Sequence, residues 1–294
     1  MKRLALLLAA LAVLAGAISV YWAGGRLAAP APRAVGDLPP DLAGHALKVP
    51  SPAAGVLKGW LLPGRREGGA VLLLHGLRAS RLDMLARARF LHALGYTVMF
   101  FDSRAHGESG GQRITFGYME SLDARTLLGA LRQAAPAERL GVIGVSLGGA
   151  AVLLGPQPLR VHALVLESVY PTLEEAIDNR LAIRLGPLGP PLAPLLTVQL
   201  RPRLGFGLED LRPIDSVDRV GAALLVIAGT EDRHTTIVQS RRLFARAQAP
   251  KEMWEVPGAG HVDYHRAAPA EYEARVGGFL ERHLRDGPGR ISRE

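Results

Sequence analysis

A chain of 294 residues, 48% hydrophobic and 21% charged, has enough apolar material for a buried core and too little charge density for a disordered chain. Its formal net charge of +8 comes from arginines that are scattered along the sequence, which argues against a nucleic-acid partner and is typical of a solvated, salt-bridged surface. Attraction to anionic lipid headgroups is the main alternative. Because the chain has no cysteine, disulfides, thiolate metal sites and a cysteine nucleophile are excluded.

The N-terminus predicts a membrane anchor. Lys2-Arg3 precedes an apolar run from Leu4 to Ala23. A run of about 20 residues can cross a bilayer, and the leading positive charges favour a cytoplasmic N-terminus with the rest of the chain on the extracytoplasmic side. We therefore expect residues 1–24 to form an uncleaved transmembrane helix.

Two other interpretations of this segment stay open. Leu4–Leu14 fits the apolar core of a signal peptide, and Ala15-Gly16-Ala17 fits its cleavage site, which would leave a secreted or periplasmic protein. The apolar run continues beyond that site, and this favours the anchor. The third interpretation is a buried first helix of the domain, but the segment has no amphipathic face that would mark a packing surface.

The organisation after the N-terminus follows from composition. Residues 25–43 are rich in alanine, proline, glycine and arginine, which predicts a semi-rigid linker. A single folded domain is expected over residues 44–286, followed by a C-terminal tail at 287–294. The domain opens with two apolar stretches, Ala46–Val49 and Val56–Leu62, around a turn-rich segment, a pattern typical of an antiparallel hairpin.

After this hairpin, continuous apolar runs alternate with helix-like segments. The runs are too unbroken for strands with one solvated face, so they predict a parallel sheet covered by helices on both faces. The predicted strands are Ala70–Leu74, Thr97–Phe101, Leu140–Val145, Ala163–Leu166, Ala223–Ala228 and the short Met253–Val256. The predicted helices are Arg81–Leu94, Met119–Ala135, Leu147–Leu154, Ile237–Ala247 and Pro269–Leu284. The fold class is therefore α/β, with a doubly wound sheet.

One interval departs from this alternation. Residues 171–213 are long, apolar and rich in proline, with Gly186-Pro187-Leu188-Gly189-Pro190-Pro191 at the centre. Segments of this length inside a compact domain are usually functional, so we expect an inserted lid. An ordinary extra helical pair packed on the core is the alternative.

The strongest local signal is Gly144-Val145-Ser146-Leu147-Gly148, between a predicted strand and a predicted helix. A serine at such a sharp turn has a strained backbone and needs small neighbours, which Gly144 and Gly148 supply. The pattern also occurs by chance as a plain turn in a glycine-rich chain, so its interpretation as a nucleophile depends on its partners.

A serine nucleophile needs an imidazole to take its proton and a carboxylate to orient that imidazole. Asp232 and His261 each follow a late predicted strand, where α/β sheets gather catalytic groups. The sequence therefore predicts Ser146 as nucleophile, His261 as base and Asp232 as acid. His234 is a competing base, more simply interpreted as a surface residue, and Glu231 is a competing acid that sequence cannot separate from its neighbour.

Acyl transfer also needs two backbone N–H groups to stabilise an oxyanion. Leu147 follows the predicted nucleophile and supplies one. Leu77, in the loop after the strand Ala70–Leu74, is expected to supply the other. His75 is interpreted as a residue that orders this loop rather than as a catalyst. The chemistry requires no metal and no cofactor.

These motifs together resemble the α/β-hydrolase superfamily over about Leu47–Leu284. The residues that carry the resemblance are His75-Gly76, Asp102–Gly111, Gly144–Gly149, Asp232 and Gly258–His261. Within the superfamily the chain is similar to small bacterial membrane-anchored serine hydrolases related to the protein-depalmitoylase-like group. The resemblance implies that the loop after Asp102 lines the mouth of the active site and that Asp102 and His106 are structural. One departure is Arg233-His234-Thr235-Thr236, which lacks the proline common after the acid in many relatives.

The predicted reaction is hydrolysis of a carboxylic ester or thioester through an acyl-serine intermediate. The apolar interval Leu185–Leu200 and the expected anchor predict a pocket for an acyl chain or for a lipid-like substrate delivered from the membrane. A peptidase or amidase is the first alternative, because substrate choice depends on the lid. A non-catalytic, membrane-tethered binding module is the second. The serine itself argues against epoxide- and haloalkane-opening relatives, which generally place aspartate there.

Overall fold

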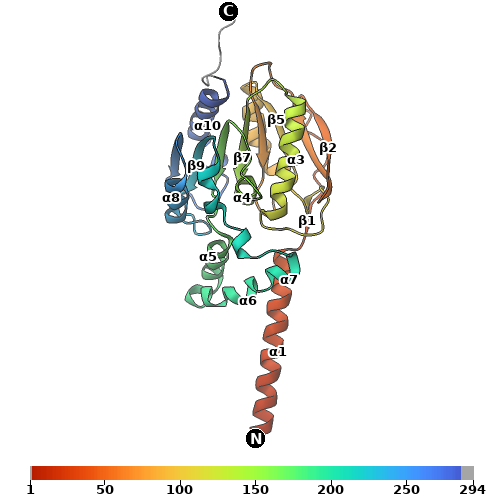
Figure 1. Cartoon of the computed structure of the whole chain (residues 1–294), viewed down its shortest axis with the longest axis vertical. Coiled ribbons are helices and arrows are strands. Elements are labelled where there is room, and N and C mark those ends of the chain that lie inside the picture. The colour runs from red at the N-terminus through yellow and green to blue at the C-terminus, as the bar shows by residue number, and fades with distance from the viewer. Residues whose placement is uncertain (1, 286–294) are drawn as a thin grey trace, which may run out of the picture.

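The computed structural model describes residues 2–285, apart from the side chains of residues 12 and 13, and the predicted tail at 287–294 lies outside the described residues. Its centre is an eight-stranded sheet in the order β2-β3-β5-β4-β7-β8-β9-β10 (Figure 1). The strands are β2 (His45–Ser51), β3 (Gly55–Leu62), β4 (Ala70–Leu74), β5 (Thr97–Phe101), β7 (Leu140–Val145), β8 (Ala163–Glu167), β9 (Ala223–Gly229) and β10 (Lys251–Val256). The β2–β3 and β3–β5 pairs are antiparallel and the other pairs are parallel, so the predicted hairpin and parallel sheet are confirmed.

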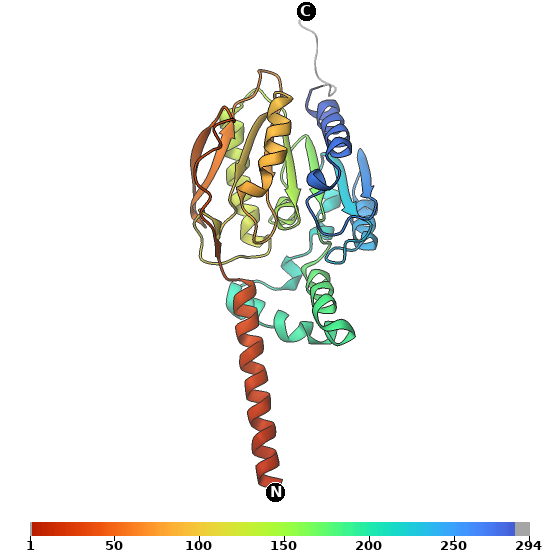
Figure 2. The ribbon, with the colours of Figure 1, turned by 180° about the vertical axis from the view of Figure 1, so that it is seen from behind.

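Helices cover both faces of the sheet, as Figures 1 and 2 show from opposite sides. One face packs against α3 (Tyr118–Ala134), α4 (Leu147–Leu153) and α8 (Ile237–Arg246). The other packs against η1 (Arg81–Met84), α2 (Leu85–Ala93), α9 (Tyr264–Ala267) and α10 (Pro269–Leu284). Successive residues of a strand point to opposite faces, so in β4 Leu72 and Leu74 join the first core while Val71 and Leu73 join the second. This two-sided burial explains why the strands are unbroken apolar runs.

The first helix, α1 (Lys2–Leu27), projects away from the domain (Figure 1). It is long and apolar enough to cross a membrane, and none of its apolar stretch is buried against the rest of the protein. Leu6 and Leu14 are exposed. The interpretation as a buried first helix is therefore wrong.

The segment predicted as a linker, residues 25–43, packs on the domain. Ala28 and Leu42 are buried, and β1 (Ala31–Pro32) pairs in parallel with β6 (His106–Gly107). Composition could not predict this packing, because the backbone of the segment bonds to a loop that is distant in sequence. The end of α1 is thereby fixed in place relative to the sheet.

Short helices occupy the interval predicted as a lid. They are α5 (Leu173–Leu185), η2 (Gly186–Leu188), η3 (Pro190–Leu192), α6 (Ala193–Thr197) and α7 (Leu200–Leu204). Three short 3-10 helices follow: η4 (Leu208–Asp210), η5 (Pro213–Asp215) and η6 (Val217–Arg219). We call α5 to α7 the inserted helices. They lie at the end of the domain from which α1 projects, and α6 contacts α1 (Figure 1).

Candidate active site

Ser146 occupies a strained turn between β7 and α4. Its φ of 48° lies in the left-handed region, which a residue with a side chain adopts only when the surroundings impose it. A Cβ at Gly144 would approach the Cα of Gly149 to 2.6 Å, and a Cβ at Gly148 would collide with the backbone carbonyl of Leu74. Both glycines are therefore required by the turn, as the sequence predicts.

Asp232 and His261 are hydrogen-bonded to each other. Asp232 follows β9 and His261 follows β10, and the imidazole Nδ1 lies 2.7 Å from the carboxylate Oδ2. The other carboxylate oxygen accepts the backbone N–H groups of His234 and Thr235 at 2.7 and 2.9 Å. Burial raises the pKa of Asp232, but these hydrogen bonds outweigh it and the pKa lies below its usual value. An ionised carboxylate makes Nδ1 the donor, which leaves Nε2 of His261 free to accept a proton.

The competing residues are placed differently. Glu231 is exposed to solvent, whereas Asp232 is buried. The sequence analysis interpreted His234 as a surface residue, and the structure corrects this interpretation. His234 is half-buried, and its ring centroid lies 5.2 Å from that of His261. The backbone of this loop folds around the Asp232 carboxylate, and that fold turns His234 toward the cavity.

Ser168 and Tyr264 support the Asp232 carboxylate, and the sequence analysis missed both. Ser168 donates its hydroxyl to Asp232 Oδ2 at 3.0 Å, and its Oγ lies 2.5 Å from the Tyr264 hydroxyl. That hydroxyl accepts the backbone N–H of Gly229 at 2.7 Å, so its own proton points to Ser168. Burial raises the pKa of Tyr264 to about 12, which keeps the proton in place. Ser168 directly follows β8, and this position at the same sheet edge was the available signal.

The loop after β4 is held by two histidines. His75 accepts the backbone N–H of Ser103 at Nε2 (2.9 Å) and donates from Nδ1 to the carbonyl of Gly76 (2.7 Å). His106 accepts the N–H of Arg78 at 2.9 Å, which fixes the loop on the other side of Leu77. These hydrogen bonds agree with the interpretation of His75 and His106 as structural residues.

The two predicted oxyanion donors share an unusual feature. Within residues 2–285, the backbone N–H groups of Leu77 and Leu147 have no hydrogen-bond acceptor. Leu147 opens α4, where first-turn N–H groups have no partner within the helix. Both residues line a cavity that Ser146 also lines. Two free donors near one hydroxyl can stabilise negative charge on a ligand oxygen.

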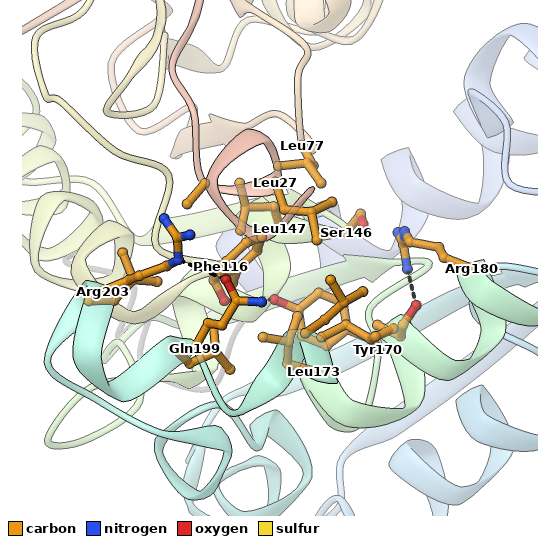
Figure 3. A pocket seen from close by; sticks show the side chains of 17 residues that line it. Leu27, Leu77, Phe116, Ser146, Leu147, Tyr170, Leu173, Arg180, Gln199 and Arg203 are labelled. Carbon is orange, nitrogen blue, oxygen red and sulfur yellow. Dashed lines mark hydrogen bonds between the residues drawn. The ribbon is translucent and has the colours of Figure 1, made fainter. Parts of the chain in front are cut away.

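Ser146 lies where two cavities meet. The larger of the two, about 360 Å³, is lined by Ser146 and His261 together with His234 and Arg180. The apolar cavity, about 70 Å³, is lined by Ser146, by the inserted helices and by the end of α1 (Figure 3). Arg180 lines both, and burial lowers its pKa. Among the described residues, no group of three or more histidine and acidic side chains is placed to hold a metal ion.

The buried His75 predicts a pH-dependent stability. Burial lowers its pKa to about 4, whereas an unfolded histidine titrates near 6.5. Between these values the unfolded chain binds more protons, so the free energy of unfolding falls as the pH decreases, by at most about 1.4 kcal/mol per pH unit from this residue. Urea titrations of the full chain at several pH values should show a smaller acid-induced loss for His75→Gln than for the wild type. Equal acid-induced losses in the two proteins would contradict the lowered pKa of His75.

The fold and the site together define the class of protein. Residues 71–275 match the alpha/beta hydrolase family, and the chain belongs to it. The uncharacterized protein Rv2307c of Mycobacterium tuberculosis is 32% identical over 261 residues, which cover 85% of each chain. The Pyrococcus furiosus esterase Pf2001 is 25% identical with a TM-score of 0.70, over 87% of this chain and 99% of that one. XC6422 of Xanthomonas campestris, a serine hydrolase without a lid, shares the fold at 17% identity with a TM-score of 0.58, over 86% of this chain and all of that one (100%).

Proposed function

We propose that this α/β hydrolase cleaves carboxylic esters or thioesters through an acyl-serine intermediate. Ser146 is the nucleophile, His261 the base and Asp232 the acid. The observation that carries the proposal is the 2.7 Å hydrogen bond from His261 to Asp232 at the edge of the cavity that Ser146 lines. The likeness to an esterase at 25% identity supports the same reaction class.

In the proposed reaction, Ser146 Oγ attacks the carbonyl carbon of the substrate while His261 Nε2 takes the hydroxyl proton. The N–H groups of Leu77 and Leu147 stabilise the resulting oxyanion, and Asp232 stabilises the imidazolium. Collapse of the tetrahedral intermediate breaks the bond to the leaving alcohol or thiol, which receives the proton from His261. Water then attacks the acyl-serine with the same base, which releases the carboxylic acid and restores the serine.

We propose that the acyl group occupies the apolar cavity and that the inserted helices act as the lid over it. Carbon atoms form nearly all of the surface that faces this cavity, which suits a hydrocarbon chain. A thioester substrate would also fit a relationship to the protein-depalmitoylase-like group. A peptidase or amidase would use the same residues, because the cavity lining bears on the acyl group and not on the leaving group. The likeness to an esterase favours the ester class over this alternative.

We propose further that α1 anchors the protein in a membrane, with the hydrolase domain on the extracytoplasmic side. The apolar stretch of α1 is exposed along its length. At the same end of the domain, the inserted helices expose Leu188 and Val198, at 77% and 69% of their surface. Apolar surface of this kind is costly in water and favourable at a bilayer surface.

The reaction class is tested with the full chain in detergent. We expect hydrolysis of p-nitrophenyl esters and acyl thioesters, surveyed from acetyl to palmitoyl, and labelling by a fluorophosphonate probe. Activity on peptides or amides with none on the ester panel would replace the esterase proposal with the peptidase alternative. A protein that neither turns over these substrates nor accepts the probe would be a binding module.

A further inference from the structure

The end of α1 is bonded to the side chains of Gln199, which precedes α7, and Arg203, which lies within α7. Gln199 Nε2 donates to the backbone carbonyl of Val20 at 3.1 Å. Arg203 donates to the carbonyl of Tyr21 and stacks over its ring, with the guanidinium carbon 3.9 Å from the ring centroid. These contacts join the first helix of the chain to an inserted helix nearly 180 residues later.

Gly24 and Gly25 make this approach possible. A glycine inside a helix costs about 0.5–1 kcal/mol relative to alanine, so a pair of them needs a structural reason. A Cβ at Gly24 would lie 2.6 Å from Gln199 Oε1, and a Cβ at Gly25 would lie 3.2 Å from an Arg203 nitrogen. At Gly16, in the exposed part of α1, a Cβ would meet nothing within 4 Å. The glycine pair therefore forms a notch in α1 that admits the side chains of Gln199 and Arg203.

The same end of α1 lines the apolar cavity beside Ser146. Gly24, Leu27 and Ala28 belong to its lining. Figure 3 shows Leu27 and Leu77 on one side of the cavity, with Leu173 and Tyr170 across from them. A segment that composition assigns to an anchor and a linker thus contributes surface to the site.

We infer that the carboxyl end of α1 is a wall of the acyl-binding site, and that Gly24 and Leu27 set the length of acyl chain that the site accepts. The inference rests on the proposed function for the nature of the ligand. A substrate chain that extends from Ser146 along the cavity reaches the end of the helix that we place in the membrane. The helix is therefore both a membrane anchor and a binding element for the acyl group.

The test compares two pairs of substitutions in the full chain. Gly24→Val adds a side chain that fills the notch, and Leu27→Ala shortens a side chain of the wall and so enlarges the cavity. The controls Gly16→Val and Leu14→Ala make the same changes on the exposed part of α1. The readout is the ratio of kcat/KM for palmitoyl and butyryl p-nitrophenyl esters. We expect Gly24→Val to lower this ratio about tenfold, from the lost burial of about two methylene groups. Leu27→Ala should raise the ratio, and both controls should leave it unchanged.

The inference is overturned if Leu27→Ala leaves the ratio unchanged, or if a control shifts it as much as its partner. Should Gly24→Val fail to fold, Leu27→Ala decides alone. If the wild type hydrolyses no ester, the proposed function fails, and the wall is judged in Ser146→Ala by photo-crosslinking with a diazirine-bearing palmitate. Crosslinks to both Leu27 and α7 that unlabelled palmitate displaces would support the wall, and their absence would reject it.

Discussion

Replacing Ser146 with alanine is expected to lower kcat/KM for a p-nitrophenyl ester by roughly 10⁵-fold and to abolish labelling by a fluorophosphonate. The alanine variant keeps the His261–Asp232 hydrogen bond and both free N–H groups, but it has no atom that can form the acyl bond. The residual rate should therefore reflect only substrate binding and oxyanion stabilisation, which commonly leave a small acceleration over water. Steady-state kinetics and gel-based labelling measure the two effects.

The matched control is Ser240→Ala on α8. The Ser240 hydroxyl is buried and has no hydrogen-bond partner among the described residues, so its removal should change neither labelling nor kcat/KM. Labelling that persists in the Ser146 variant would place the reactive group elsewhere. Loss of labelling in both variants would show that the probe reports on folding rather than on a nucleophile.

The sheet and the positions at its edge could be predicted from sequence. Strands buried on two faces are continuous apolar runs, and such runs have sharp ends, so the residues that follow them are easily located. Ser146, Asp232 and His261 each follow a strand end, and the structure brings these positions to one edge. The turn at Ser146 needs glycines on both sides because a Cβ there would collide with nearby backbone. This cause is local, so the need for glycine could be predicted from the sequence.

Contacts between distant segments could not be predicted. The strands Ala31–Pro32 and His106–Gly107 pair over only two residues each. Strands this short have no apolar pattern by which the sequence could reveal them. The approach of α7 to α1 is encoded by Gly24-Gly25, but a glycine pair in an apolar run is also compatible with a plain anchor. The orientation of His234 follows from hydrogen bonds to Asp232 that are visible only in three dimensions.

The burial of several arginines also could not be predicted from composition. They were interpreted as a solvated surface, yet Arg81, Arg87 and Arg104 are buried in ion pairs. Arg87 on α2 makes two hydrogen bonds to the Glu167 carboxylate, at 3.0 and 2.6 Å, and Glu167 is the last residue of β8. A formal charge count cannot distinguish such pairs from exposed ones, because both contribute equally to the sum.

Arg87→Met is expected to lower the free energy of unfolding by about 3–5 kcal/mol. Both partners are almost fully buried, so removing the cation leaves the Glu167 carboxylate in a low-dielectric interior. The hydroxyl of Tyr272, which donates to that carboxylate at 2.6 Å, cannot replace a charge. Urea titration monitored by tryptophan fluorescence measures the loss.

The control is Arg89→Met, two residues along the same helix. Arg89 pairs with Asp41 at 2.8 Å in an exposed position, where an ion pair contributes about 0–1 kcal/mol. The double variant Arg87→Met/Glu167→Gln should recover part of the loss, because it removes the unpaired charge as well as its partner. Equal losses for Arg87→Met and Arg89→Met would mean that the buried ion pair contributes no more than the exposed one. No recovery in the double variant would mean that the unpaired Glu167 charge is not the cause of the loss. Since Glu167 precedes Ser168, which holds the Asp232 carboxylate, the Arg87 variant should also lower kcat for esters at temperatures where it remains folded.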